Sequence, residues 1–193
     1  MNLPSSGGPS APDSQLRRIA VAALAARVVG IDGRSGAGKS TLAAELAAEI
    51  GRIAPERRVT IVEVEDFIAG WDGLVTGVRY VASNVAAPLA REGLAVTRNW
   101  DWVADAWGSE RRIPDDGVAD IVLLTGCGST SKPCVPFLDL TIWCEADRDA
   151  RRARAAARDP YDWSEQWETW ADQEAVLLAE HRSDLLADIV VES

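Results

Sequence analysis

A glycine-rich stretch from Gly33 to Thr41 carries the clearest chemistry in this chain. Its letters, GRSGAGKST, fit the pattern G-x-x-x-x-G-K-[ST], which is typical of loops that bind nucleotide phosphates. The glycines allow backbone N–H groups to turn inward around a phosphate, and a helix start adds unpaired N–H groups. Lys39 is then expected to reach the β- and γ-phosphates, while the Ser40 hydroxyl can hold Mg²⁺.

Both flanks of this loop support a nucleotide site. Residues 27–32, RVVGID, predict a short buried strand, and residues 41–50 predict a helix with an apolar face. We therefore expect ATP and Mg²⁺ as cofactors, and we expect the Lys39 side chain to be exposed to the empty site. Every residue of the loop is a candidate cofactor contact: Gly33, Arg34, Ser35, Gly36, Ala37, Gly38, Lys39, Ser40 and Thr41.

A second strand is predicted at residues 58–66, and it ends in Glu65 and Asp66. In open parallel α/β sheets, ligands bind beyond the carboxyl ends of the strands. No other predicted strand brings an acid straight to the phosphate mouth. Asp66 is therefore our candidate general base, a candidate acceptor contact and, with Ser40, a candidate Mg²⁺ ligand. Because side chains alternate along a strand, Glu65 is expected on the opposite face.

Strands and helices alternate along the rest of the chain, which predicts an α/β fold with a parallel sheet and helices on both faces. Residues 94–114 show no clear period, and we expect an irregular segment there with a short strand at 95–98. The predicted strands are residues 27–32, 58–66, 119–124, 138–144 and 187–191. The predicted helices are residues 14–26, 41–50, 78–91, 147–158 and 162–182.

Composition limits the classes of partner. The 193 residues are 47% hydrophobic and carry a net charge of −10, which suits one domain and argues against nucleic-acid or anionic-membrane partners. Residues 1–13 are rich in Pro, Ser and Gly and predict a flexible tail before a domain at 14–193. The three cysteines form no C-x-x-C pair, so we expect no zinc site and a reducing cytoplasm. Neither a signal peptide nor a membrane span is expected.

An arginine cluster lies on the helix predicted near the C-terminus. Arg151, Arg154 and Arg158 share one helix face, and Arg148 and Arg152 share a neighbouring face. Guanidinium groups suit phosphate oxygens, and such a cluster is informative in an acidic protein. The alternative is a solvated helix whose arginines pair with nearby aspartates. We choose Arg148 and Arg152 as the catalytic pair.

Two sets can be distinguished among the eight tryptophans. Trp71, Trp100, Trp102 and Trp107 lie in segments predicted to be irregular, with charged neighbours. Aromatic faces stack on flat bases, so Trp71, Trp100, Trp102 and Asp101 are candidate acceptor contacts. Packing of long loops is the open alternative. Helical spacing predicts a core stripe for a further set: Trp163, Trp167 and Trp170.

Taken in order, these motifs resemble the uridine kinase-like group of P-loop nucleoside and nucleotide kinases. The resemblance implies a three-layer P-loop NTPase-type fold and transfer of the γ-phosphate of ATP to a hydroxyl acceptor, with a nucleoside expected. It also implies Asp66 as the base and an arginine-bearing lid near residues 147–160. The matching stretches are GRSGAGKS at 33–40, EDFIAGWDGL at 65–74, PLAREG at 88–93, NWDW at 99–102, DRDARRAR at 147–154 and RD at 158–159.

Two positions depart from the pattern of that group. The group often carries Glu-Gly after its third strand, where this chain has Thr125-Gly126, so fewer acids are left to hold magnesium. The carboxylate pair after the second strand is usually Asp-Asp, and here it is Glu65-Asp66. A nucleotide-binding protein with weak or no phosphotransfer is therefore an alternative, as is a kinase for a non-nucleoside metabolite. A GTPase is disfavoured because no Asn-Lys-x-Asp motif is present.

Overall fold

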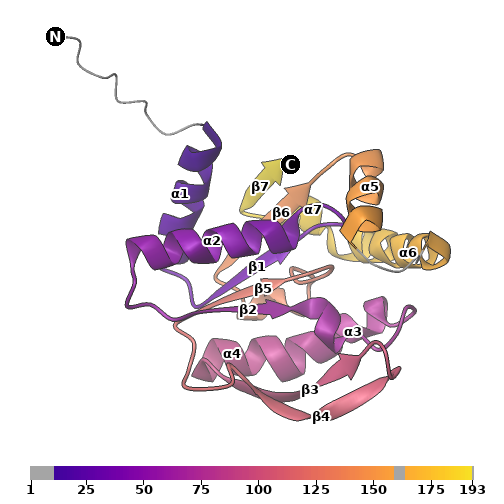
Figure 1. The fold of residues 1–193 in the computed structure, drawn as a ribbon, viewed down its shortest axis with the longest axis horizontal. Helices are drawn as coiled ribbons and strands as arrows, with labels where there is room; N and C mark the ends of the chain where they lie inside the picture. The colour runs from indigo at the N-terminus through magenta and orange to yellow at the C-terminus, as the bar shows by residue number, and fades with distance from the viewer. Residues whose placement is uncertain (1–10, 159–163, 193) are drawn as a thin grey trace.

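A five-stranded sheet in the order β2-β5-β1-β6-β7 forms the centre of the computed structural model (Figure 1). The structure describes residues 11–158 and 164–192. Every pairing in this sheet is parallel, which confirms the predicted α/β class and its five strands. The strands are β1 (Val28–Asp32), β2 (Val59–Glu63), β5 (Ile121–Thr125), β6 (Leu140–Glu145) and β7 (Ile189–Glu192).

Helices cover both faces of the sheet, as the apolar strands require. Consecutive side chains of β1 and β5 enter different cores: Val28 and Val122 pack on one face, and Val29 and Leu123 on the other. The second face is covered by α1 (Ala11–Ala23) and α2 (Lys39–Ile53). The first face packs against the segment that follows β2 and against the C-terminal helices. This is the three-layer arrangement that the sequence predicts.

One continuous helical segment follows β2 and a loop. It consists of α3 (Leu74–Val81), a π-helical segment η2 (Ala82–Ala86) and α4 (Ala87–Glu92). Pro88 lies in the first turn of α4 and has no backbone N–H to donate, so the regular ladder of hydrogen bonds cannot pass through it. The helix begins earlier than the predicted start at residue 78.

The expectation of an irregular segment at residues 94–114 is wrong. Strands β3 (Ala95–Asp101) and β4 (Ala106–Ile113) form an antiparallel hairpin that lies outside the main sheet (Figure 1). The register shifts between Arg98, which pairs with Glu110, and Trp100, which pairs with Trp107, so β4 has one residue more than β3 at this point. Because an extra residue interrupts the alternation of side chains, the sequence pattern of β4 is blurred.

The C-terminal third adds α5 (Arg148–Arg158), α6 (Ser164–His181) and the short α7 (Ser183–Leu186). Arg182 separates α6 from α7 in a left-handed conformation with φ of 57°. The predicted tail at residues 1–13 falls mostly outside the described residues, and so does Trp163. Among the described helices, none is long and apolar enough to cross a membrane.

Candidate active site

The glycine-rich loop connects β1 to α2 and has the backbone that a phosphate cradle needs. Gly36 and Gly38 adopt φ values of 78° and 86°, which side chains disfavour. A Cβ atom at Gly36 would also collide with the backbone of Arg151 in α5. Helix α2 begins at Lys39, directly after the loop, so its free N–H groups face the same site.

Lys39 is buried, with only 8% of its surface exposed, so the expectation of an exposed side chain is wrong. Its Nζ donates to the Arg34 carbonyl at 3.3 Å and to Cys127 Sγ at 3.4 Å. Burial alone lowers the pKa of Lys39, but nearby acidic groups, led by Cys127 and Glu65, raise it by more. The net effect keeps the ammonium charged, as phosphate binding requires.

Glu63, the last residue of β2, is a site residue that the sequence reasoning missed. Its Oε2 accepts a hydrogen bond from Ser40 Oγ at 3.4 Å. Burial raises the pKa of Glu63 to about 7, and the charge of Glu65 adds to this, while the Ser40 hydrogen bond opposes it. A signal for it was present, because Glu63 also lies at the carboxyl end of the strand.

The strand ends earlier than predicted, and this changes the position of Glu65. Residues 64–67 form a 3-10 turn, η1 (Val64–Phe67), in place of the last part of a strand. Strand alternation therefore does not apply, and the expectation that Glu65 faces away is wrong. Glu65 Oε1 accepts the backbone N–H of Cys127 at 2.9 Å, and its negative charge helps to raise the pKa of Lys39.

Asp66 lies in the same turn and is half-buried. Burial raises the pKa of Asp66 and Glu65 adds to this, while Arg111 of β4 lowers it. Asn99 Nδ2 donates to Asp66 Oδ2 at 3.3 Å, and Asn99 lies on β3 where the register with β4 shifts. The hairpin thus brings an amide onto the candidate base.

The arginine helix α5 lies on the glycine-rich loop through Arg151. This side chain is buried, and its Nη1 donates to the Ser35 carbonyl at 3.2 Å. Arg148 is exposed and forms an ion pair with Glu168 at 3.4 Å, and Arg152 is also exposed. The structure thus brings Arg151 to the loop and leaves Arg148 and Arg152 at the surface of α5.

Two of the candidate acceptor contacts form part of a packed aromatic cluster. The Trp71 ring centroid lies 5.1 Å from that of Trp102 and 6.0 Å from that of Trp170 in α6. Trp102 Nε1 also donates to the Glu65 carbonyl at 3.1 Å. These contacts favour the packing alternative for Trp71 and Trp102.

The other two acceptor candidates lie on the hairpin. Trp100 packs edge-to-face on Trp107 at 5.5 Å, and its buried Nε1 has no hydrogen-bond partner among the described residues. Asp101 is exposed, and its Oδ1 accepts the backbone N–H groups of Val103 and Ala104 at 2.9 Å. Asp101 thus shapes the tip of the hairpin.

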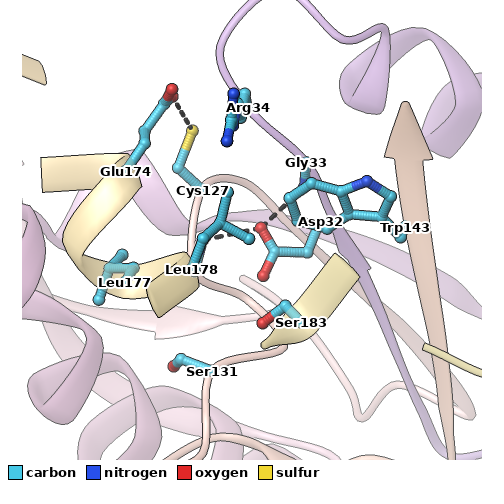
Figure 2. Close-up of a pocket in the computed structure, with 11 residues that line it drawn as sticks. Asp32, Gly33, Arg34, Cys127, Ser131, Trp143, Glu174, Leu177, Leu178 and Ser183 are labelled. Atoms are coloured by element: carbon cyan, nitrogen blue, oxygen red, sulfur yellow. Dashed lines mark hydrogen bonds between the residues drawn. The ribbon is translucent and has the colours of Figure 1, made fainter. Parts of the chain in front are cut away.

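Asp32, at the end of β1, ties the glycine-rich loop to the loop after β5 (Figure 2). Its carboxylate accepts the N–H groups of Gly33 at 2.7 Å and Gly128 at 2.9 Å, and both the N–H and the hydroxyl of Thr130. Burial raises the pKa of Asp32, although these hydrogen bonds oppose the effect. The clamp fixes the start of the loop relative to Cys127.

A large cavity extends from the other end of the loop. Its volume is about 410 Å³, and it is lined by Ala37, Gly38 and Thr41 of the loop, by Arg154 of α5 and by residues of α1, α2, β6 and β7. Its size is in the range of pockets that hold small ligands.

Two solved structures share this architecture over nearly the whole chain. A possible uridine kinase from Bacillus stearothermophilus is 18% identical, with a TM-score of 0.67 over 92% of this chain and 97% of that one. A putative fructose transport system kinase from Silicibacter sp. TM1040 is 17% identical, with a TM-score of 0.61 over 91% of this chain and 98% of that one. No family model and no curated protein matches the sequence. At these identities the likeness shows the fold alone, a parallel α/β sheet with helices on both faces and a glycine-rich loop after β1.

Proposed function

We propose that this protein is a kinase that transfers the γ-phosphate of ATP to the hydroxyl group of a small molecule. The observation that carries the proposal is the meeting of the glycine-rich loop with the end of β2. The Ser40 hydroxyl lies 3.4 Å from Glu63 Oε2, and Glu65 and Asp66 follow within one turn. Phosphoryl transfer needs a phosphate cradle, a metal-holding oxygen set and a base in the same place, and these residues supply all three.

A magnesium ion at this point would depend on waters as well as on protein oxygens, because the described residues hold no group of three acidic, His or Cys side chains that could bind a metal ion. Mg²⁺ prefers hydroxyl and carboxylate oxygens, and it usually keeps several waters. Ser40 and Glu63 would hold it on the side of α2, with Asp66 as the further carboxylate expected from the sequence. When bound, the ion would neutralise charge on the phosphates of the nucleotide.

Asp66 would take the proton of the acceptor hydroxyl. A base works best when its pKa approaches the working pH, and burial raises the pKa of Asp66 in that direction. Asn99 orients the carboxylate by donating to Oδ2, which leaves Oδ1 for the acceptor. Lys39 would stabilise the charge on the transferred group, with Arg148 and Arg152 as the expected lid cations.

The cavity beside Ala37 and Gly38 would hold the sugar and base of the nucleotide. It adjoins the loop at the end of the cradle away from Glu63 and Asp66, and Arg154 lines it from the lid helix. A nucleotide placed along the loop would thus have its base in this cavity and its terminal phosphate near Asp66.

A nucleoside is the acceptor class that we propose first. The resemblance of the motif order supports it, and the Bacillus stearothermophilus structure described as a possible uridine kinase is in keeping with it. A sugar is the second acceptor class. It is suggested by the Silicibacter structure, which is described as a putative fructose transport system kinase.

A nucleotide-binding protein without efficient phosphotransfer is the alternative function. Thr125 at the end of β5 supports it, because this buried residue places no acid where the resembling group carries a glutamate. Glu65 weakens this argument. Its carboxylate packs against Gly126 and binds the Cys127 N–H, so an acid from the neighbouring turn fills the place beside Lys39.

The experiment that separates these functions is an ADP-release screen with nucleosides, nucleotides, sugars and vitamin precursors, run on the wild type and on Asp66→Asn. A kinase should show acceptor-dependent ADP release that falls about 10²–10⁴-fold in the variant, while ATP binding persists. Slow hydrolysis that is the same in both proteins and insensitive to every acceptor would favour the alternative. Unchanged acceptor-dependent turnover in Asp66→Asn would remove Asp66 from the role of base.

A further inference from the structure

A carboxylate from α6 occupies the mouth of the glycine-rich loop. Glu174 Oε1 accepts the backbone N–H of Ser35 at 2.6 Å. The same oxygen accepts the thiol of Cys127 at 3.2 Å (Figure 2). Only 5% of the surface of Glu174 is exposed, and its charge contributes to the raised pKa of Lys39. A buried anion beside the motif lysine has the environment that the motif normally offers to a phosphate.

Glu174 and a nucleotide phosphate therefore compete for the same groups. The Ser35 N–H carries one proton, and it is bonded to the carboxylate. A second anion at Lys39 would lie close to Glu174 in a buried site, where like charges repel strongly. A cavity of about 190 Å³ adjoins Glu174, so a displaced carboxylate has room to move. Its charged lining consists of Arg34, Arg148 and Arg151 together with Glu168 and Asp172.

The same helix holds the loop that leads from the candidate base. Gln173, the residue before Glu174, donates from Nε2 to the Trp71 carbonyl at 2.6 Å and accepts the Leu74 N–H at 2.9 Å. Trp170, one turn earlier, packs on Trp71 at 6.0 Å. A movement of α6 at Glu174 would thus reach the segment just after Asp66.

We propose that Glu174 is a positioning residue that binds the glycine-rich loop at the place of a phosphate and is displaced when the β- and γ-phosphates of ATP enter. Its displacement shifts α6 and, through Gln173 and Trp170, rearranges residues 71–74 beside the acceptor site. The proposal rests on the proposed nucleotide binding and extends it. Phosphate bound in the loop would determine the conformation of residues 71–74 beside the acceptor site.

The first test is calorimetric titration of the wild type, Glu174→Gln and Glu180→Gln with ATP and with AMP, in the presence of Mg²⁺. Glu180 is an exposed residue of the same helix and serves as the matched control. Glu174→Gln keeps an oxygen for the Ser35 N–H but removes the competing charge. It should bind ATP about tenfold more tightly than the wild type, within the usual range of coupling between sites. AMP, which lacks the competing phosphates, should bind all three proteins alike.

The second test uses hydrogen exchange in the wild type alone, so it does not depend on a variant that folds. Addition of ATP should increase exchange at the Leu74 amide, whose hydrogen bond to Gln173 is loosened. No change at residues 71–74 on ATP binding would overturn the proposal, and so would equal ATP affinity in the wild type and Glu174→Gln. A failure of all three proteins to bind ATP would instead refute the proposed function itself, and the displacement with it.

Discussion

Glu63→Gln tests whether the pKa of the carboxylate beside Ser40 is raised as its surroundings indicate. The pKa of Glu63 rises from 4.5 to about 7 in the folded protein, with burial as the first cause. Between these two values the folded state binds more protons than the unfolded state, so ionisation of Glu63 lowers stability as the pH rises. From pH 5.5 to pH 8 the two pKa values give a loss of about 2 kcal/mol, which partial exposure reduces to about 1 kcal/mol.

The wild type should therefore lose about 1 kcal/mol of stability relative to Glu63→Gln over this pH range, which corresponds to roughly 2–4 °C in Tm. Urea unfolding at pH 5.5 and pH 8, followed by tryptophan fluorescence, measures the difference. Glu92→Gln, an exposed change at the end of α4, is the control and should follow the wild type. Parallel pH dependences in the wild type and Glu63→Gln would refute the raised pKa. In the presence of Mg²⁺ and ATP, the stability of the wild type relative to Glu63→Gln should instead rise with pH, because Mg²⁺ favours the ionised carboxylate.

Three further predictions concern the cations of the site. Lys39→Ala should abolish ATP turnover and, because it leaves buried acids without their cation, should also lower stability by about 3 kcal/mol, whereas Lys39→Arg should retain most of that stability. Normal turnover in Lys39→Ala would exclude this lysine from the mechanism. Arg148→Ala and Arg152→Ala should each reduce turnover at least about tenfold with little change in Tm, since both side chains are exposed. By contrast Arg151→Ala should lower Tm, because Arg151 is buried against the loop.

The parallel sheet was predictable because its strands carry continuous apolar runs between turn signals. All of residues 121–125 are buried, so their apolar run identifies the strand without an alternation of polar and apolar side chains. The hairpin was not predictable by the same means. Its strands are short of apolar residues, and the extra residue of β4 between Trp107 and Glu110 breaks the alternation that identifies a half-buried strand.

The candidate site likewise contains parts that the sequence predicts and parts that it does not. The glycine-rich loop and Lys39 follow from local spacing, because one turn of chain supplies the entire cradle. Glu174 could not be inferred, since its contact with Ser35 joins residues 139 positions apart, and only the packing of α6 creates it. Helical spacing places Glu174 on the same face as Trp167 and Trp170, which marks it as buried but does not indicate what it meets.

The end of β2 explains how a chain with Thr125 in place of an acid can still surround Lys39 with negative charge. A strand continued to Asp66 would turn the side chain of Glu65 away from the lysine. The 3-10 turn at Val64–Phe67 instead rotates Glu65 toward the loop after β5, where Gly126 leaves room that any side chain would fill. Glu65 then binds the Cys127 N–H. The missing acid and the shortened strand are therefore linked, and a side chain at position 126 would collide with the Glu65 carboxylate and remove it from the site although no charged residue is replaced.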